Sequence, residues 1–295
     1  MLKMVLPSGS LQKGTMEMFE KADLSISVPD SRSYEATIDD RRIAMVRWMR
    51  PQEIPIYIQE GLFDLGIAGY DWIAERGCLN DVEMVAKLKY SKQSNQPVRI
   101  VVAVAESADI NDVTDIKPGS KITTEYVGIT KDYFVSLGIP VKVEFSYGTT
   151  EAKVPEIADV AVELTESGSS LRANRLKIVG TIMESSTMLV ANKDSWNNPE
   201  KRRHIDDVVT LLLGALDARG QALVKMNVHQ RHLDAIISVL PSMKTPTVSR
   251  LFGDKSDYLA VESVVEKVSI NVLIPQLKGA GAEDIIELPI AKVIR

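Results

Sequence analysis

Short apolar runs alternate with amphipathic stretches along most of the chain, and this alternation constrains the fold more than any other feature. The runs at 43–48 and 98–104 have the length of strands, and the second is apolar almost throughout. Stretches between such runs, for example 54–62, repeat apolar residues at the spacing of one helix face. Strands that are apolar on both faces are typical of sheets covered by helices on either side. We therefore predict an α/β fold with mostly parallel sheets.

Residues 221–295 follow an order of their own after Gly220, which ends a long amphipathic stretch at 200–219. The predicted order is strand, helix, strand, strand, helix, strand, which is the ferredoxin-like βαββαβ unit. The strands are expected at 222–228, 245–251, 259–265 and 285–288, and the helices at 231–240 and 272–280. Because a chain of 295 residues is long enough for two or three domains, we predict that this unit folds separately.

Composition excludes several classes of protein. The 35 basic and 40 acidic side chains leave a net charge of −5, whereas a nucleic-acid-binding protein usually carries a basic excess. The single cysteine, Cys78, can form neither an intrachain disulfide nor a cysteine-rich metal centre. Apolar runs stay far below the ~20 residues of a membrane-spanning helix, and Pro7 interrupts the first of them. We therefore expect a cytoplasmic protein that binds neither nucleic acid nor a membrane.

The segment 158–174 is the most informative for function, because a buried strand ends there in acidic residues and a loop of hydroxyls and glycine follows. The hydroxyls and backbone N–H groups of such a loop bind phosphate, and Gly168 lets the backbone approach the ligand closely. Glu163 or Glu166 suits sugar hydroxyls or a hydrated magnesium ion. The pattern fits a 5-phosphoribosyl group better than a dinucleotide, which needs a Gly-x-Gly-x-x-Gly loop. A simple helix N-cap turn explains the local pattern equally well.

Two other strand-to-helix turns are candidates for ligand binding. In the segment 50–71 a helix precedes a strand, which places Gly69 and Asp71 at the carboxyl edge of a sheet, where α/β proteins bind ligands. Spacing alone also fits a plain helix–strand unit with a tight turn. The turn at 7–10 is of the same type, and it either holds an anion or caps a helix.

Together these segments resemble the ATP phosphoribosyltransferase family in its long, self-sufficient form. The most specific similarities are 163–174, which resembles the phosphoribosyl-pyrophosphate loop of the family, and 50–71. Further similar motifs lie at 6–11, 90–94, 148–151, 244–249 and 289–294. Several motifs in the order of the family over the whole chain argue against chance similarity.

The resemblance implies a catalytic module of two α/β lobes with the type II periplasmic-binding-protein fold and a substrate cleft between them. Such lobes exchange strands, so the first lobe would combine 1–95 with 180–215, and the second would span 96–179. The unit at 221–295 would be the ACT-like regulatory domain of the family, which binds histidine as a feedback inhibitor. The family also implies a homo-oligomer, a hexamer built from dimers.

The implied reaction is the first step of histidine biosynthesis. N1 of the adenine of ATP attacks C1 of phosphoribosyl pyrophosphate, which gives phosphoribosyl-ATP and pyrophosphate. Mg²⁺ is the expected cofactor, held mainly by substrate phosphates, and its protein ligands stay unassigned. The reaction requires no side-chain nucleophile, in agreement with a sequence that contains no Gly-x-Ser-x-Gly motif.

The site residues follow from the resemblance by position. The loop for the 5-phosphate would comprise Glu166, Ser167, Gly168, Ser169, Ser170 and Leu171. The catalytic residues would be Arg50, Asp71, Glu151 and Glu163. ATP or pyrophosphate would bind Ser8, Gly9, Ser10, Gly69, Lys92 and Arg172. Ser8 and Ser10 stand where many members carry Lys and Arg, so other cations, such as Lys92, Arg99 and Arg172, would have to replace those contacts.

Two alternatives stay open at this point. A two-lobed protein of this kind can also bind or sense a small molecule without catalysis, and such a binder would tolerate the removal of magnesium. The domain at 221–295 can also serve oligomerisation alone, in which case it would not bind histidine.

Overall fold

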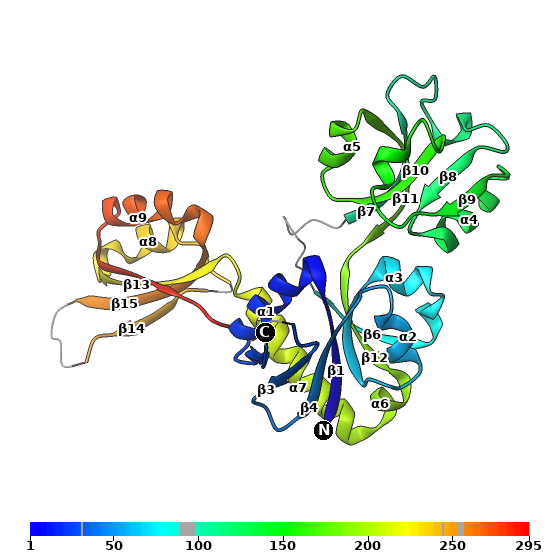
Figure 1. The fold of residues 1–295 in the computed structure, drawn as a ribbon. Coiled ribbons are helices and arrows are strands. Elements are labelled where there is room, and N and C mark those ends of the chain that lie inside the picture. Colours follow the sequence, from blue (N-terminus) through cyan, green and yellow to red (C-terminus); the bar gives the residue numbers. More distant parts are fainter. Residues whose placement is uncertain (31, 89–97, 244, 253–256, 295) are drawn as a thin grey trace. The chain divides into compact units, whose positions relative to one another are not determined.

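The computed structural model describes the chain except for residues 31, 89–97, 244, 253–256 and 295 (Figure 1). The chain divides into two compact units. Unit 1 comprises Met1–Glu20 and Leu24–Val209, and unit 2 comprises Lys21–Asp23 and Thr210–Arg295. Within the described ranges, no helix is both long and apolar enough to cross a membrane.

Unit 1 contains a seven-stranded sheet, here called the first sheet, in the order β2-β3-β4-β1-β5-β12-β6. Its strands are β1 (Leu2–Pro7), β2 (Ile26–Ser27), β3 (Glu35–Ile38), β4 (Ile43–Met49), β5 (Leu65–Gly69), β6 (Val82–Leu88) and β12 (Thr187–Asn192). The accompanying helices are α1 (Gln12–Lys21), α2 (Ile54–Gln59), α3 (Tyr70–Glu75), α6 (Lys193–Asn197) and the first part of α7 (Pro199–Asp217). β1 pairs in parallel with β4 and β5, and the other neighbours are antiparallel.

The centre of the first sheet is tightly packed. A Cβ atom at Gly66 would lie 2.6 Å from Cγ1 of Val5, so glycine allows β1 and β5 to approach each other. Ile54 and Ile58, two of the apolar positions that predict the helix at 54–62, lie in one buried cluster with Val5. The apolar face of α2 therefore packs on the sheet at these two positions, whereas α2 ends at Gln59 and Leu62, the third apolar position of the predicted helix, is exposed.

The second sheet of unit 1 has five strands in the order β11-β7-β10-β8-β9. They are β7 (Val98–Ala105), β8 (Lys121–Thr124), β9 (Lys142–Phe145), β10 (Val160–Thr165) and β11 (Leu176–Ser185), with helices α4 (Val127–Ser136) and α5 (Ser169–Ala173) and a 3-10 turn at Thr150–Lys153. Alternate residues of β7 pack into two separate apolar clusters, Ile100 and Val102 into one and Val101 and Ala103 into the other. Burial on both faces explains the continuous apolar run at 98–104.

The prediction of mostly parallel sheets is wrong, because both sheets are mixed. In the second sheet β8, β9 and β10 are parallel, whereas β7 is antiparallel to β10 and β11. One cause is the path of the chain, which returns from the second sheet to the first through the strands β11 and β12 rather than through a helix. In the first sheet, β3 is also antiparallel to both β2 and β4. β11 ends at Ser185, and the chain enters the first sheet again with β12 at Thr187. Two α/β sheets that exchange strands confirm the predicted two-lobed, type II periplasmic-binding-protein-like fold.

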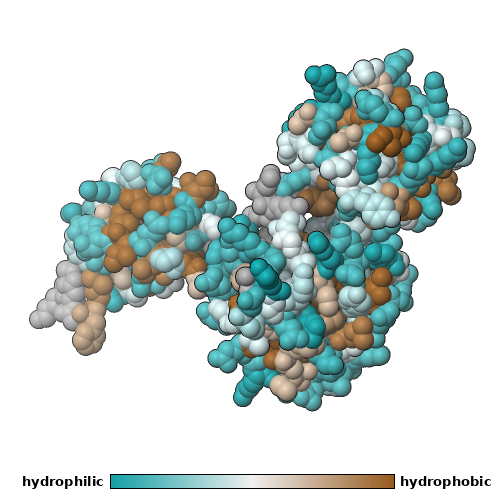
Figure 2. Space-filling model, viewed as in Figure 1, coloured by the Kyte–Doolittle hydropathy of each residue, from teal (hydrophilic) through white to brown (hydrophobic). Residues whose placement is uncertain are grey.

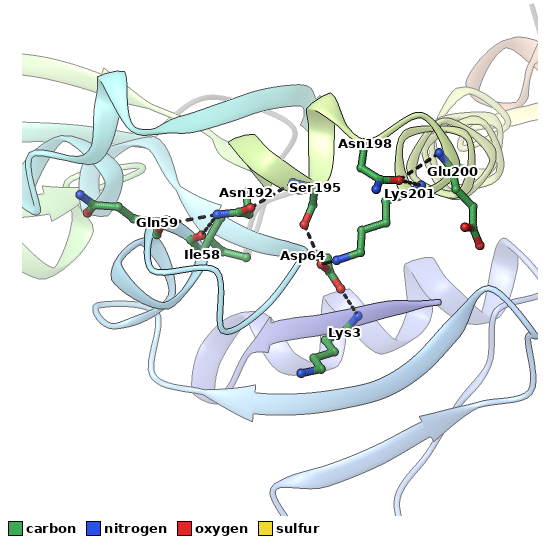
Figure 3. A network of polar contacts seen from close by, with 9 residues as sticks. All are labelled: Lys3, Ile58, Gln59, Asp64, Asn192, Ser195, Asn198, Glu200 and Lys201. Carbon is green, nitrogen blue, oxygen red and sulfur yellow. Dashed lines mark hydrogen bonds and ion pairs between the residues drawn. The ribbon is translucent and has the colours of Figure 1, made fainter.

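The amino end of β5 is fixed by the buried carboxylate of Asp64 (Figure 3). This carboxylate accepts hydrogen bonds from the backbone N–H of Lys3 (2.7 Å), the hydroxyl of Ser195 (2.6 Å) and the ammonium group of Lys201 (2.6 Å). Burial acts to raise the pKa of Asp64, but these donors together hold that pKa below its ordinary value. Asp64 therefore ties β1, α6 and α7 to one end of the first sheet.

Unit 2 contains a four-stranded antiparallel sheet in the order β14-β15-β13-β16. Its elements are β13 (Gln221–His229), α8 (Leu233–Val239), β14 (Thr247–Arg250), β15 (Tyr258–Glu266), α9 (Ile270–Gly279) and β16 (Ala282–Pro289). Both helices lie on one side of the sheet (Figure 1), and Ile236 and Leu273 pack there against the buried side of β13. This element order confirms the predicted ferredoxin-like fold.

Candidate active site at the carboxyl ends of the strands

The turns that follow β1, β4 and β5 lie at one edge of the first sheet, because these strands are parallel. The backbone N–H and the hydroxyl of Ser8 both donate to the carbonyl oxygen of Met49, at 2.8 and 3.0 Å. These bonds join the turn after β1 to the turn that begins with Arg50. The side chain of Arg50 is exposed. Gly9 has φ +79°, a conformation that favours glycine, and Ser10 is exposed beside it.

Asp71, just after β5, is only 3% exposed, and both of its carboxylate oxygens accept hydrogen bonds. The hydroxyl of Ser185 donates to Oδ1 (2.5 Å) and accepts a hydrogen bond from the backbone N–H of Asp71 (3.0 Å). The hydroxyl of Tyr126 donates to Oδ2 (2.8 Å). A Cβ atom at Gly69 would lie 2.1 Å from Oδ1, so this arrangement requires glycine there.

The parallel strands β8, β9 and β10 also end at one edge, and the loops after them gather there. Tyr126 follows β8, the segment 146–151 follows β9, and the segment 166–171 follows β10. The hydroxyl of Ser170 donates a hydrogen bond to the carboxylate of Glu151. The structure therefore brings Glu151 next to the predicted phosphoribosyl-pyrophosphate loop.

The backbone of the loop at 166–171 is held by the side chains of the two flanking residues, Thr165 and Arg172. Gly168 has φ +71°, and its N–H donates to the hydroxyl of Thr165 (2.8 Å). The guanidinium group of Arg172 donates to the carbonyl oxygen of Ser167 (2.9 Å), so this cation supports the loop directly. Glu166 is half-buried, and the hydroxyl-bearing residues Ser167, Ser169 and Ser170 are exposed.

Leu171 has a different environment from the rest of this loop. It is 1% exposed and packs in an apolar cluster with Val101 and Leu176. Its side chain therefore anchors the start of α5 in the core of the second sheet, while the three serines of the loop are exposed.

Glu163, near the end of β10, lies in an environment that disfavours its charge. Burial raises the pKa of Glu163 to about 7, and the negative charges of Glu151 and Glu125 add to this effect. A hydrogen bond from Thr150 acts in the opposite direction and lowers the pKa of Glu163. Thr150 is itself buried and lies 2.9 Å from the hydroxyl oxygen of Ser146. Glu163 is thus a carboxyl group that changes protonation near neutral pH, a common property of functional sites.

Several contributors to this arrangement are not predicted from the sequence. Tyr126 follows a strand end, as the other candidates do, and this position is the signal that could have found it. Ser185 offers no such signal, because its partner Asp71 is 114 positions away in the chain. The predicted ligand Lys92 lies outside the described residues.

Two family models match the chain. The model described as ATP phosphoribosyltransferase covers residues 50–214, and the one described as HisG, C-terminal domain, covers 218–292. The chain belongs to the ATP phosphoribosyltransferase family. Proteins named ATP phosphoribosyltransferase from Desulforudis audaxviator and Pelotomaculum thermopropionicum are 47% and 46% identical over 293 residues, which is 99% of this chain and of each relative. The predicted family is therefore confirmed.

A solved structure of an ATP phosphoribosyl transferase (HisG:HisZ) complex from Thermotoga maritima is similar in fold. Its TM-score is 0.61 at 21% identity, over 72% of this chain and 99% of that chain. At this identity the likeness supports the fold alone. As a member of the ATP phosphoribosyltransferase family, the chain is a transferase of histidine biosynthesis, which confirms the predicted class of enzyme.

Proposed function

We propose that the chain transfers the 5-phosphoribosyl group of phosphoribosyl pyrophosphate to N1 of ATP at the carboxyl edges of its two sheets. The observation that supports this assignment best is the loop at 166–171, where Gly168 in the left-handed region presents three exposed serines beside Glu151 and Glu163. Hydroxyls and oriented backbone N–H groups bind a phosphate, and adjacent carboxylates bind ribose hydroxyls. We therefore assign phosphoribosyl pyrophosphate to the second sheet.

The carboxylates beside this loop also fit the expected Mg²⁺. Among the described residues, no cluster of three or more His, Cys, Asp or Glu side chains is arranged to hold a metal ion. Mg²⁺ typically binds one or two carboxylates together with substrate phosphates, and Glu151 and Glu163 can serve in that mode. When bound there, the ion would neutralise negative charge on the departing pyrophosphate.

ATP would bind at the edge of the first sheet. The turn at 8–10, Arg50 and Gly69 lie at the ends of neighbouring strands, and Arg50 is an exposed cation. The ribose gains positive character and the pyrophosphate gains negative charge as their bond breaks, so the site must place two polyanions in line and stabilise the separating charges. Arg50 and Arg172 would stabilise the negative side. The buried Asp71, in the first turn of α3, would keep an oriented negative charge at this edge.

Unit 2 would regulate the enzyme. We infer that 221–295 is the regulatory domain and that histidine binds it as feedback inhibitor. For the catalytic module, we infer a first lobe of 1–95 with 180–215 and a second lobe of 96–179. We also infer a homo-oligomer of the hexamer and dimer type. Figure 2 shows apolar residues gathered on the visible surface of unit 2. The exposed apolar side chains of unit 2 include Val248, Val268, Val272 and Ile286. Contiguous patches of exposed apolar side chains are typical of surfaces that other subunits cover.

Gly168→Val tests the loop assignment. A β-branched residue is strained at φ +71°, so the loop must change conformation and its hydroxyls must move. We expect the affinity for phosphoribosyl pyrophosphate with Mg²⁺, measured by calorimetry, to fall about 100-fold, which is close to 3 kcal/mol.

Gly138→Val is the matched control. Gly138 also has φ +71°, lies just after α4, and has open space where a Cβ atom would stand. It should lower stability by a similar backbone strain without changing substrate affinity. Unchanged affinity in Gly168→Val would refute the loop assignment.

Phosphoribosyl-ATP formation with and without histidine tests the regulatory proposal on the full chain. Suppression by histidine is the expected result. Activity that histidine leaves unchanged would contradict the proposal and would leave assembly as the role of unit 2.

A further inference from the structure

Helix α3 follows a strand of the first sheet, yet it is built into the core of the second sheet. The indole of Trp72 lies with its ring centroid 4.6 Å from the ring of Tyr126. Trp72 also belongs to the buried cluster that contains Val102 of β7 and Phe134 of α4. α3 thus connects the carboxyl end of β5 to the apolar core beneath the loops of the second sheet.

Two carboxylates of α3 bind the amino end of α4. Asp71 accepts the hydrogen bond from the hydroxyl of Tyr126, the residue that precedes α4. One turn later, Glu75 accepts hydrogen bonds from the backbone N–H groups of Gly128 and Ile129, both at 2.9 Å. These are N–H groups of the first turn of α4, which have no partner inside the helix. A Cβ atom at Gly128 would lie 3.3 Å from a carboxylate oxygen of Glu75, so the two helices are in close contact.

The contact between Asp71 and Tyr126 resists separation, because both groups are buried. Their exposed fractions are 3% each, and a buried carboxylate that loses a donor is costly. Burial and the charge of Asp71 hold the pKa of Tyr126 well above its ordinary value, so the phenol stays a hydrogen-bond donor at all physiological pH values. Ser185, the last residue of β11, adds a third element to this contact. Its hydroxyl donates to Asp71 at the point where the chain returns to the first sheet.

We propose that Tyr126 and Glu75 are positioning residues for the transfer: they fix α3 to α4 and thereby hold the carboxyl end of β5 in register with the loop at 166–171. The proposal rests on the proposed function, in which ATP and phosphoribosyl pyrophosphate bind to different sheets. Reaction requires the two reacting atoms to be aligned, and a misplacement of about 1 Å can lower a rate about 100-fold. The α3–α4 contact joins the two edges directly, together with the hydrogen bond between Asp71 and Ser185.

Tyr126→Phe removes only the hydroxyl and keeps the ring against Trp72. We expect kcat for phosphoribosyl-ATP formation to fall about 10- to 100-fold, because the two edges lose their fixed spacing. The dissociation constants of phosphoribosyl pyrophosphate with Mg²⁺ and of ATP, each measured alone, should stay within about twofold of wild type, since each substrate still has its own edge. Glu75→Gln, which loses one of two acceptor oxygens, should change kcat in the same direction by a smaller factor.

Tyr133→Phe is the matched control, because Tyr133 lies on the same helix and its hydroxyl is near Gly180 rather than Asp71. It should leave kcat unchanged. A kcat of Tyr126→Phe within about twofold of wild type, per folded molecule, would overturn the proposal. An equal loss of substrate affinity would also overturn it, because it would show that the hydroxyl contacts a substrate. Neither result depends on Gly168→Val, which tests the loop assignment separately.

Discussion

The two ends of strand β5 each carry a buried aspartate, and the surrounding residues stabilise the two carboxylates in different ways. At the amino end, Asp64 pairs with the cation of Lys201 and accepts two further hydrogen bonds (Figure 3). At the carboxyl end, Asp71 accepts hydrogen bonds from the neutral hydroxyls of Ser185 and Tyr126, and within the described ranges no cation pairs with it. Hydroxyls orient a carboxylate without cancelling its charge. The cation of Lys201 and the two other donors compensate for the burial of the charge of Asp64, whereas the hydroxyls hold the charge of Asp71 in a fixed place at the edge where we propose that ligands bind.

The largest expected effect comes from Gly69→Ala. The backbone of Gly69 suits any residue, but the new Cβ atom would lie 2.1 Å from Oδ1 of Asp71, so the carboxylate must leave the hydroxyl of Ser185. We expect kcat to fall about 100-fold and the free energy of unfolding to fall by about 2–3 kcal/mol, because the displaced groups are buried. Steady-state kinetics and urea unfolding measure the two effects.

Gly77→Ala is a control for a loss of stability that does not involve Asp71. Gly77 follows α3 with φ +69° and has open space where a Cβ atom would stand. Alanine there should lower stability by about 1 kcal/mol and leave kcat unchanged. Equal losses of kcat in the two variants would contradict the role given to Asp71.

Asp64→Asn should affect stability alone. The substitution removes the charge that faces Lys201, whose side chain is 38% exposed, so the loss is smaller than for a fully buried pair. We expect the free energy of unfolding to fall by about 2 kcal/mol while kcat per folded molecule is unchanged. A loss of kcat in the folded protein would show that the amino end of β5 also affects catalysis.

The smallest expected effect is a pH dependence with opposite signs at the two carboxyl groups. The pKa of Glu163 rises from 4.5 to about 7 on folding, so its stabilising effect is complete below pH 4.5 and is lost as pH rises to about 7. The pKa of Asp64 lies below 3.8, so its stabilising effect is present above that pH and is lost as pH falls through the folded value. Because Glu163 is only half-buried, we expect a contribution of about 1–2 kcal/mol.

Unfolding by urea at pH 5 and pH 8 tests whether Glu163 makes the free energy of unfolding fall as pH rises. Wild type should lose more stability than Glu163→Gln as pH rises, since glutamine cannot titrate. The same pH dependence in both proteins would contradict the raised pKa of Glu163.

The sequence predicts elements well where burial follows a simple period. In β13, alternate residues are buried along the whole strand, and the predicted range 222–228 differs from the observed strand only at its ends. Strand direction is harder, because it depends on where the chain goes next. The apolar run at 98–104 is the same whether its neighbours are parallel or antiparallel, so it does not predict the mixed sheets.

The candidate site shows the same limit. Gly168 and Gly69 are visible in the sequence as glycines at strand ends, and the structure gives each a physical reason, a positive φ in one case and contact with Asp71 in the other. The hydrogen bonds of Tyr126 and Ser185 to Asp71 connect residues 55 and 114 positions apart, so no local pattern encodes them. The roles assigned to the site residues stay predictions until the variants are measured.

The most direct test of the account is kcat for phosphoribosyl-ATP formation by Asp71→Asn and Asp64→Asn, measured side by side with Mg²⁺ and corrected for the folded fraction by circular dichroism. We predict a fall of about 100-fold for Asp71→Asn, because the oriented charge is lost at the ligand-binding edge, and a wild-type value for Asp64→Asn. Full activity of Asp71→Asn, or an equal loss in both variants, would contradict the assignment of catalysis to the carboxyl edge.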